Sequence, residues 1–188
     1  MPRNIEIKAC LDDIDAVLRR ARALADGPEV LIEQDDTFYP AASGRLKLRR
    51  FTDGTAELIH YERPDGAHAR ASDYVRVPIA DPDALHEALA RGLGDIGRVR
   101  KRRWLLLAGQ TRIHLDRVER LGDFLELEVV LRDGQTDAEG AMIAEGLMQA
   151  LGLADARRLT GAYLDLLRER GAPATGAGWP RTGLATSA

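Results

Sequence analysis

The sequence predicts an α+β fold in which eight antiparallel strands form a closed barrel with helices packed outside it. Eight runs of residues have the composition or the alternation of β-strands. Turn signals such as Ser43-Gly44, Asp53-Gly54 and Asp65-Gly66 separate neighbouring runs and indicate hairpins. Several runs also have one charged and one apolar face. A chain of 188 residues with 45% hydrophobic content suits one globular domain.

Strands are expected at residues 4–10, 30–39, 45–51, 56–63, 74–78, 99–107, 111–118 and 124–131. Apolar residues at helical spacing predict a first helix after residues 12–13, which ends at Gly27-Pro28. Asp81-Pro82 begins a second helix that Gly92 ends, and residues 136–151 and 160–170 form two more. The domain is expected to span residues 1–170. Residues 171–188 are rich in Gly, Ala, Pro and Thr and are expected to be a disordered tail.

Charged residues recur at every second position in five of the predicted strands. In residues 45–49, for example, the three cations share one face of the strand and the leucines share the other. For a single strand, a solvated charged face is the simpler explanation. Five such strands beside helices that need an apolar surface favour a barrel with the charges inside. The charged faces are Glu6 and Lys8; Arg45, Lys47 and Arg49; Lys101 and Arg103; Arg112, His114 and Asp116; and Glu126 and Glu128.

A barrel interior with this many cations predicts a bound polyanion. Two like charges about 4 Å apart repel by roughly 4 kcal/mol at an effective dielectric of about 20, so they require water, carboxylates or an anionic ligand. Guanidinium groups bind phosphate oxygens bidentately. The carboxylates Glu6, Glu126 and Glu128 offer the oxygen ligands that suit Mg²⁺ or Mn²⁺. Together these residues predict a site for a metal ion and a triphosphate.

The composition argues against binding to nucleic acid and against association with a membrane. The net charge of −3 is unlike that of a dedicated nucleic-acid-binding protein. The single cysteine, Cys10, is expected to be an unreactive strand residue. Because neither an apolar signal region nor a run of about 18 apolar residues is present, we expect a cytoplasmic protein with no membrane association. The sequence leaves open whether it is a monomer or a homodimer.

Six segments, in order along the chain, resemble the CYTH family, which includes class IV adenylate cyclases, thiamine triphosphatases and inorganic triphosphatases. The resemblance extends to about residue 170. It implies a tunnel of eight antiparallel strands, in which basic side chains hold a triphosphate and acidic side chains hold divalent metal. The segments are NIEIK at 4–8, QDDTFY at 34–39, GRLKLR at 44–49, LDRV at 115–118, LGDFLELE at 121–128 and AYLDLL at 162–167.

The resemblance implies roles for individual residues. The metal ligands are Glu6, Glu126 and Glu128. The phosphate ligands are Lys8, Arg45, Lys47, Arg49, Lys101, Arg103 and Arg112, and the looser matches Arg63 and Arg76 are added to them. Asn4 replaces the first acid of the family signature, so the affinity for metal or the number of metal ions is expected to differ from that of relatives.

Some residues keep two interpretations. Glu6, Lys8 and Asp116 are the candidate catalytic residues, but Asp116 equally suits a carboxylate that neutralises Arg112 or another cation. His114 either contacts the substrate from the lumen or is structural. An aromatic residue at helical spacing, such as Tyr163, is more often part of the core than a residue that closes the tunnel.

The sequence leaves three functions open. The length and single-domain layout favour a class IV adenylate cyclase-like enzyme that converts ATP to cyclic AMP and pyrophosphate. The alternative enzyme is a triphosphatase that hydrolyses inorganic triphosphate, thiamine triphosphate or a nucleoside triphosphate. The third function is a non-catalytic sensor of nucleotide or polyphosphate, suggested by Asn4.

Overall fold

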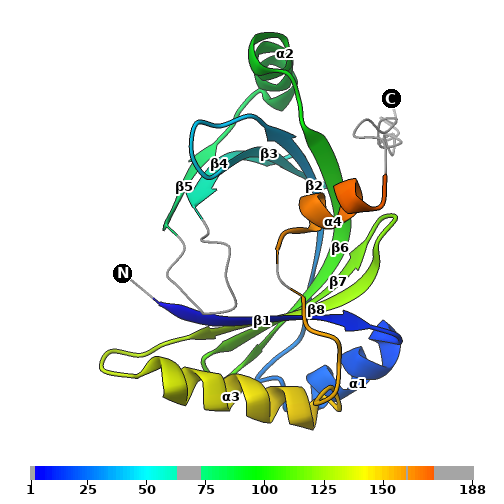
Figure 1. Cartoon of the computed structure of the whole chain (residues 1–188), viewed down its shortest axis with the longest axis vertical. Coiled ribbons are helices and arrows are strands. Elements are labelled where there is room, and N and C mark those ends of the chain that lie inside the picture. Colours follow the sequence, from blue (N-terminus) through cyan, green and yellow to red (C-terminus); the bar gives the residue numbers. More distant parts are fainter. Residues whose placement is uncertain (1–2, 63–72, 160, 172–188) are drawn as a thin grey trace, which may run out of the picture.

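The computed structural model describes residues 3–62, 73–159 and 161–171, and it shows one curved sheet with helices around it (Figure 1). The strands are β1 (Asn4–Leu11), β2 (Val30–Tyr39), β3 (Arg45–Phe51), β4 (Ala56–Glu62), β5 (Asp73–Pro78), β6 (Gly97–Ala108), β7 (Thr111–Val118) and β8 (Gly122–Val130). The helices are α1 (Ile14–Leu24), α2 (Pro82–Leu93), α3 (Asp137–Ala150) and α4 (Tyr163–Glu169). The predicted α+β class, the eight strands and the four helices are confirmed.

The eight strands form a single antiparallel sheet in the order β1-β8-β7-β6-β2-β3-β4-β5. β1 and β5 are therefore the edge strands. Within the described residues no hydrogen-bonded pairing joins these two edges, so the closed barrel stays a prediction. The curvature of the sheet nevertheless gives it a concave inner face, toward which α4 projects (Figure 1).

Local signals in the sequence fix where the helices begin. The carboxylate of Asp81 accepts a hydrogen bond from the backbone N–H of Ala84 at 2.9 Å, and Pro82 occupies the first turn, as predicted. Asp13 caps α1 in the same way, through the N–H of Ala16. Helix α4 begins at Tyr163, after the predicted start at residue 160.

The apolar core lies on the convex face of the sheet. Helices α1 and α3 cover the outward-facing leucines and isoleucines of β7 and β8, and α2 covers the outer face of β2, β3 and β4. Gly140 of α3 allows a close approach to the sheet, because a Cβ at this position would lie 2.4 Å from Leu131 and 2.6 Å from Ile5. With the apolar faces covered in this way, the polar faces of the strands are left for the concave side.

Helix α4 packs against one end of the concave face. Its residues Tyr163, Leu164 and Leu167 form a buried apolar cluster with side chains from four strands. The strand residues in this cluster are Phe38, Val99, Val118 and Phe124. The end of the concave face near α4 is therefore packed with apolar side chains, and the charged part of that face lies beyond it.

Three sequence predictions fall outside the described residues. They are Arg63 at the end of the predicted fourth strand, the hairpin turn at Asp65-Gly66, and residues 172–188 of the predicted tail. The extent of the single domain, residues 1–170, likewise stays a prediction. No helix in the described part of the chain has the length and apolar character needed to cross a lipid bilayer.

Candidate functional site

The concave face of the sheet contains a cavity of about 510 Å³, which lies within the range of roughly 300–1,000 Å³ typical of small-molecule sites. All eight strands and α4 contribute side chains to it. The alternation of the strands explains which residues line it, because every second side chain of each strand faces inward. The predicted site residues that line the cavity are Glu6, Lys8, Lys47, Arg49, Arg76, Lys101, Arg103, Arg112, His114, Glu126 and Glu128.

Asp116 anchors the cations of one wall. It is fully buried, and Arg103 binds both of its oxygens with distances of 2.6 Å from Nε and from Nη2. The ammonium of Lys101 donates to Oδ2 at 3.0 Å, and the hydroxyl of Tyr163 donates to the same oxygen at 3.0 Å. Burial opposes the charge on Asp116, but Lys101 and Arg103 outweigh it and hold the pKa well below its usual range. Asp116 therefore orients two predicted phosphate ligands. It neutralises neighbouring cations, as one of its two sequence interpretations predicted, and Arg112 pairs with Glu128 instead.

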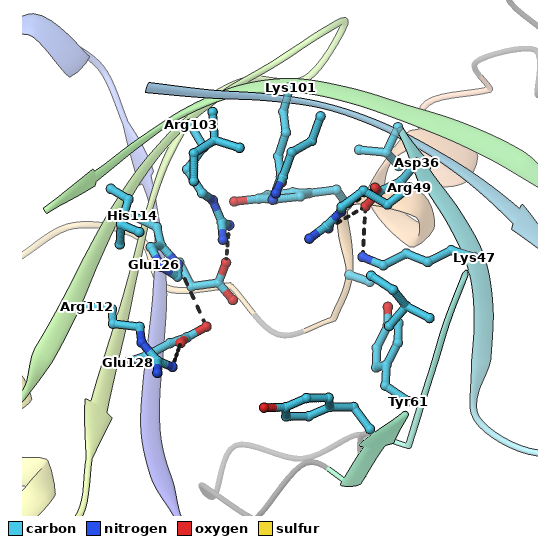
Figure 2. Close-up of a pocket in the computed structure, with 18 of the residues that line it drawn as sticks. Asp36, Lys47, Arg49, Tyr61, Lys101, Arg103, Arg112, His114, Glu126 and Glu128 are labelled. Carbon is cyan, nitrogen blue, oxygen red and sulfur yellow. Dashed lines mark hydrogen bonds and ion pairs between the residues drawn. The ribbon is translucent and has the colours of Figure 1, made fainter. Parts of the chain in front are cut away.

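Asp36, on the strand next to β6, plays the same part for Lys47 and Arg49, and the sequence did not identify it as a site residue. Arg49 binds its two oxygens at 2.7 Å each, and Lys47 donates to Oδ2 at 2.8 Å. Despite burial, the charges of Arg49 and Lys47 hold the pKa of Asp36 well below its usual range. Figure 2 shows the Asp36 group on the opposite side of the pocket from Arg103 and Glu126.

The two lysines of these clusters have lowered pKa values, so each loses its charge more readily than an exposed lysine. Burial lowers the pKa of Lys101 to about 7, and the nearby positive charge of Arg103 adds to the shift. Burial also lowers the pKa of Lys47 to about 8, against the attraction of Asp36. Because burial disfavours the charged form of both lysines, a nearby negative charge on a bound anion would stabilise that form.

An acidic wall lies on β1 and β8. Glu126 contacts Arg103 at 2.9 Å and lies 3.7 Å from the ammonium of Lys8. Burial opposes its ionisation, but Lys8 and a hydrogen bond with Glu6 hold its pKa well below the usual range. Glu128 lies directly across from Glu6 in the β1–β8 register. The three predicted metal ligands therefore share one inner surface.

Arg112, His114 and Glu128 form the outer part of this wall (Figure 2). Nη1 of Arg112 donates to Oε2 of Glu128 at 3.2 Å, and the arginine side chain is 49% exposed. His114 is buried, and burial lowers its pKa to about 3, so its imidazole is neutral. Arg112 therefore stands at the solvent side of the site, and His114 lies deeper.

Two predicted phosphate ligands are engaged at the margin of the site. Arg45 donates to Asp165 of α4 at 2.7 Å and does not line the cavity, although it belongs to the same row as Lys47. Arg76 lines the cavity, is 52% exposed and binds Glu57 at 2.5 Å. These two side chains hold neighbouring elements in place rather than standing in the buried cation clusters.

Tyr163 is a buried core residue, as the preferred sequence interpretation predicted, and it also lines the cavity. Its ring packs on Phe124, with 5.0 Å between ring centroids, as a core residue would. The ammonium groups of Lys8 and Lys101, however, lie 4.5 Å and 5.2 Å from the centre of the ring. Helical spacing predicted that Tyr163 is buried, but it could not predict that the ring contacts two lysines of the cavity.

The acidic wall suits a divalent metal ion that is bound jointly by protein carboxylates, substrate phosphates and water. In residues 3–62, 73–159 and 161–171, no three Asp, Glu, His or Cys side chains are gathered closely enough to enclose a metal ion. Mg²⁺ and Mn²⁺ are commonly bound by one or two carboxylates together with substrate phosphates and water. The paired carboxylates Glu6 and Glu126, with Glu128 beside them, have the chemistry for that mode of binding.

Comparisons with known proteins agree with the fold described above. Protein PH1012 of Pyrococcus horikoshii OT3 is 26% identical, with a TM-score of 0.73 over 88% of this chain and 99% of that chain. A conserved hypothetical protein of Pyrococcus furiosus is 22% identical, with a TM-score of 0.73 over 87% of this chain and 99% of that one. HpAC1 of Hippeastrum, whose dominant activity is described as that of a triphosphatase, is 16% identical, with a TM-score of 0.65 over 91% and 96%.

Below 25% identity, such likeness shows the fold alone. No curated protein matches the chain. A family model does match it, however: the CYTH domain, over residues 2–163. This match covers the eight strands and reaches the first residue of α4. The chain belongs to the CYTH domain family.

Proposed function

We propose that the protein is a divalent-metal-dependent enzyme that acts on a triphosphate in this cavity, with ATP as substrate and cyclic AMP and pyrophosphate as products. The observation that carries the proposal is the pair of buried cation clusters on the inner faces of β3 and β6, the two strands that flank β2. Lys47 and Arg49 belong to one cluster, and Lys101 and Arg103 belong to the other. A linear polyanion between them satisfies both clusters at once.

The clusters position the phosphate chain. Because Asp36 and Asp116 fix the two guanidinium groups through bidentate contacts, the donors that remain on each arginine point in defined directions. Preorganised charges of this kind stabilise the negative charge that shifts along the phosphates during transfer. Lys8, on the floor of the site between Glu126 and Tyr163, adds a further positive charge.

The acidic wall supplies the remaining chemistry. A metal ion bound there would neutralise phosphate oxygens and polarise the phosphorus under attack, with Glu6, Glu126 and Glu128 as its protein ligands. In the cyclase reaction, the ribose 3′ oxygen attacks the α-phosphorus and pyrophosphate leaves. The proton of that hydroxyl passes to Glu6, the candidate catalytic carboxylate of the same wall.

Aromatic and apolar side chains beyond the cations support a substrate with an organic group. Tyr61, Tyr74, Phe51 and Ile59 line the cavity on β3, β4 and β5, on the side away from the acidic wall. An inorganic triphosphate has no organic group that could pack on these side chains, whereas the base of a nucleotide stacks on aromatic rings. Tyr74 is 62% exposed, so the cavity is open to solvent beside it. That opening favours hydrolysis by water, and triphosphatase activity is therefore the second candidate.

Product analysis distinguishes these reactions. The protein is incubated with ATP, inorganic triphosphate or thiamine triphosphate and either Mg²⁺ or Mn²⁺, and cyclic AMP, pyrophosphate and orthophosphate are separated. Cyclic AMP with equimolar pyrophosphate, lost in Glu126→Gln, supports the cyclase. Orthophosphate without cyclic AMP identifies a triphosphatase. Tight binding with no product from any substrate contradicts an enzymatic function and supports the sensor.

Proton uptake is expected when a triphosphate binds at pH 8. With a pKa of about 7, Lys101 is mostly neutral at that pH in the free protein. A bound polyanion favours the charged form and raises this pKa, so the complex takes up protons, and the affinity falls as the pH rises from 7 to 9. Calorimetric titration with inorganic triphosphate, in buffers of different ionisation enthalpy, measures the uptake.

The control for this prediction is Lys101→Arg, because a guanidinium remains charged over the whole pH range. The variant is expected to show less proton uptake at pH 8 than the wild-type protein. At pH 6, where Lys101 is already protonated, the two proteins are expected to behave alike. Equal uptake by both proteins at pH 8 would show that Lys101 does not titrate on binding.

A further inference from the structure

One buried nitrogen in the cavity has no bonding partner that the fold provides. His114 is 5% exposed and lines the cavity, and its Nδ1 has no hydrogen-bond partner in the described part of the chain. A buried polar atom left without a partner costs about 1–3 kcal/mol. Such an atom in a ligand cavity indicates that a bound group completes its interactions.

An oxygen of Glu128 lies near this nitrogen. The distance between Nδ1 and Oε1 is 3.8 Å, which is too long for a hydrogen bond. The other oxygen of the same carboxylate, Oε2, is held by Arg112 at 3.2 Å. Arg112 therefore fixes the carboxylate so that Oε1 is directed toward the imidazole, as Figure 2 shows.

The gap between these two atoms has the size that a shared metal ion requires. Imidazole nitrogen and carboxylate oxygen each bind Zn²⁺, a first-row divalent ion, at about 2.0–2.2 Å, so two ligands of one such ion are at most about 4.4 Å apart. The register of the sheet places Glu6 directly across from Glu128 on the neighbouring strand. A carboxylate from β1 can thus approach the same ion.

We propose that Nδ1 of His114 and Oε1 of Glu128 bind the same divalent metal ion, and that the imidazole makes the site select Mn²⁺ over Mg²⁺. The proposal rests on the metal dependence in the proposed function and deepens it. Mg²⁺ is bound almost entirely by oxygen, whereas transition-metal ions accept imidazole nitrogen readily. Because no set of three ligands is gathered beforehand in the described residues, the site closes around the ion as it binds.

Asn4 agrees with a set of metal ligands that differs from the one the family signature implies. Asn4, which also lines the cavity, lies where the family signature has an acid, so one negative charge is lost from the wall. A neutral imidazole adds a ligand without restoring that charge. The expected consequence is a site whose preference among metal ions depends on nitrogen coordination more than on charge.

Pulsed electron paramagnetic resonance of Mn²⁺ bound to the full chain, without substrate, tests the proposal directly. Nitrogen-14 modulation from one coordinated imidazole is expected in the wild-type protein and in His60→Gln, a control that changes a histidine outside the cavity. The modulation is expected to disappear in His114→Gln. In competition titrations, the preference for Mn²⁺ over Mg²⁺ is expected to fall at least about 10-fold in that variant.

Three outcomes overturn the proposal: Mn²⁺ bound with no nitrogen signal, a signal that persists in His114→Gln, or no Mn²⁺ binding at all. The wild-type spectrum alone decides the first and the third of these outcomes, even if a variant fails to fold. Circular dichroism checks the folding of each variant.

The result of this test can be distinguished from a failure of the proposed function. Triphosphate turnover with an oxygen-only metal site refutes the role of His114 alone, whereas a nitrogen signal without turnover of any triphosphate refutes the enzyme alone.

Discussion

Replacing Asp116 with asparagine is expected to lower the free energy of unfolding by about 3–5 kcal/mol at pH 7, because removing one partner of a buried ion pair leaves an uncompensated buried charge. Asp116 is fully buried and contacts both Lys101 and Arg103. Asparagine keeps the shape and one acceptor for the hydroxyl of Tyr163 but removes the negative charge. Denaturant unfolding, followed by circular dichroism, measures the change.

The matched control is a carboxylate in an ion pair on the surface. Glu145 binds Arg158 at 2.6 Å, and both side chains are about half exposed. Exposed pairs contribute between zero and about 1 kcal/mol, so Glu145→Gln is expected to stay within that range. If Asp116→Asn changed the stability no more than the control, the buried cation cluster would not depend on Asp116 as described.

Replacing Arg103 with methionine is expected to weaken the binding of inorganic triphosphate by at least about 30-fold, which corresponds to about 2 kcal/mol. Truncating one partner of a buried, hydrogen-bonded charge pair commonly costs about 2–5 kcal/mol. Arg103 is held by Asp116 and Glu126 with its side chain only 11% exposed. Calorimetric titration gives the affinity, and a melting curve confirms that the variant is folded.

The neighbouring residue supplies the control for this prediction. Arg102 is adjacent in sequence but faces outward, where it is 50% exposed and pairs with Glu33. Arg102→Met removes the same charge from the chain and is expected to leave the affinity within about threefold of the wild-type value, since surface charges act weakly through screened solvent. A similar loss in both variants would mean that net charge, not the inner face of β6, governs binding.

The alternation of charged and apolar residues was enough to predict most of the site. Because a strand turns every second side chain to the same face, the register brings Lys8, Lys47, Arg49, Lys101 and Arg103 to one concave surface. The hairpin signals likewise predicted the strands of the sheet. Neither signal determines whether the two edge strands meet, because closure depends on the curvature of the whole sheet.

The residues that the sequence missed lie where this alternation is mixed. The inner face of β2 carries Ile32, Gln34, Asp36 and Phe38, which is neither a charged nor an apolar row. Asp36 therefore gave no signal of its own, although its position opposite Arg49 in the register identifies it once the strands are paired. The role of Tyr163 depends on where α4 packs, which helical periodicity does not specify.

Arg45 shows a limit of this alternation. It lies at the same alternate positions of the strand as Lys47 and Arg49, and the phosphate-binding role that the family resemblance implies for it stays a prediction. In the structure it binds Asp165, so a helix far along the chain determines where its guanidinium lies. Parity predicts the face of a strand from which a side chain projects, but a long flexible side chain still selects its partner from whatever packs there.

The most direct test of the account is a crystal structure of the protein soaked with inorganic triphosphate in the absence of divalent metal, so that the ligand is held but not turned over. The triphosphate is expected in the cavity, with its oxygens in contact with Lys47 and Arg49 of β3 and with Lys101 and Arg103 of β6. A triphosphate bound elsewhere, or a cavity that takes up none at saturating concentration, would contradict it.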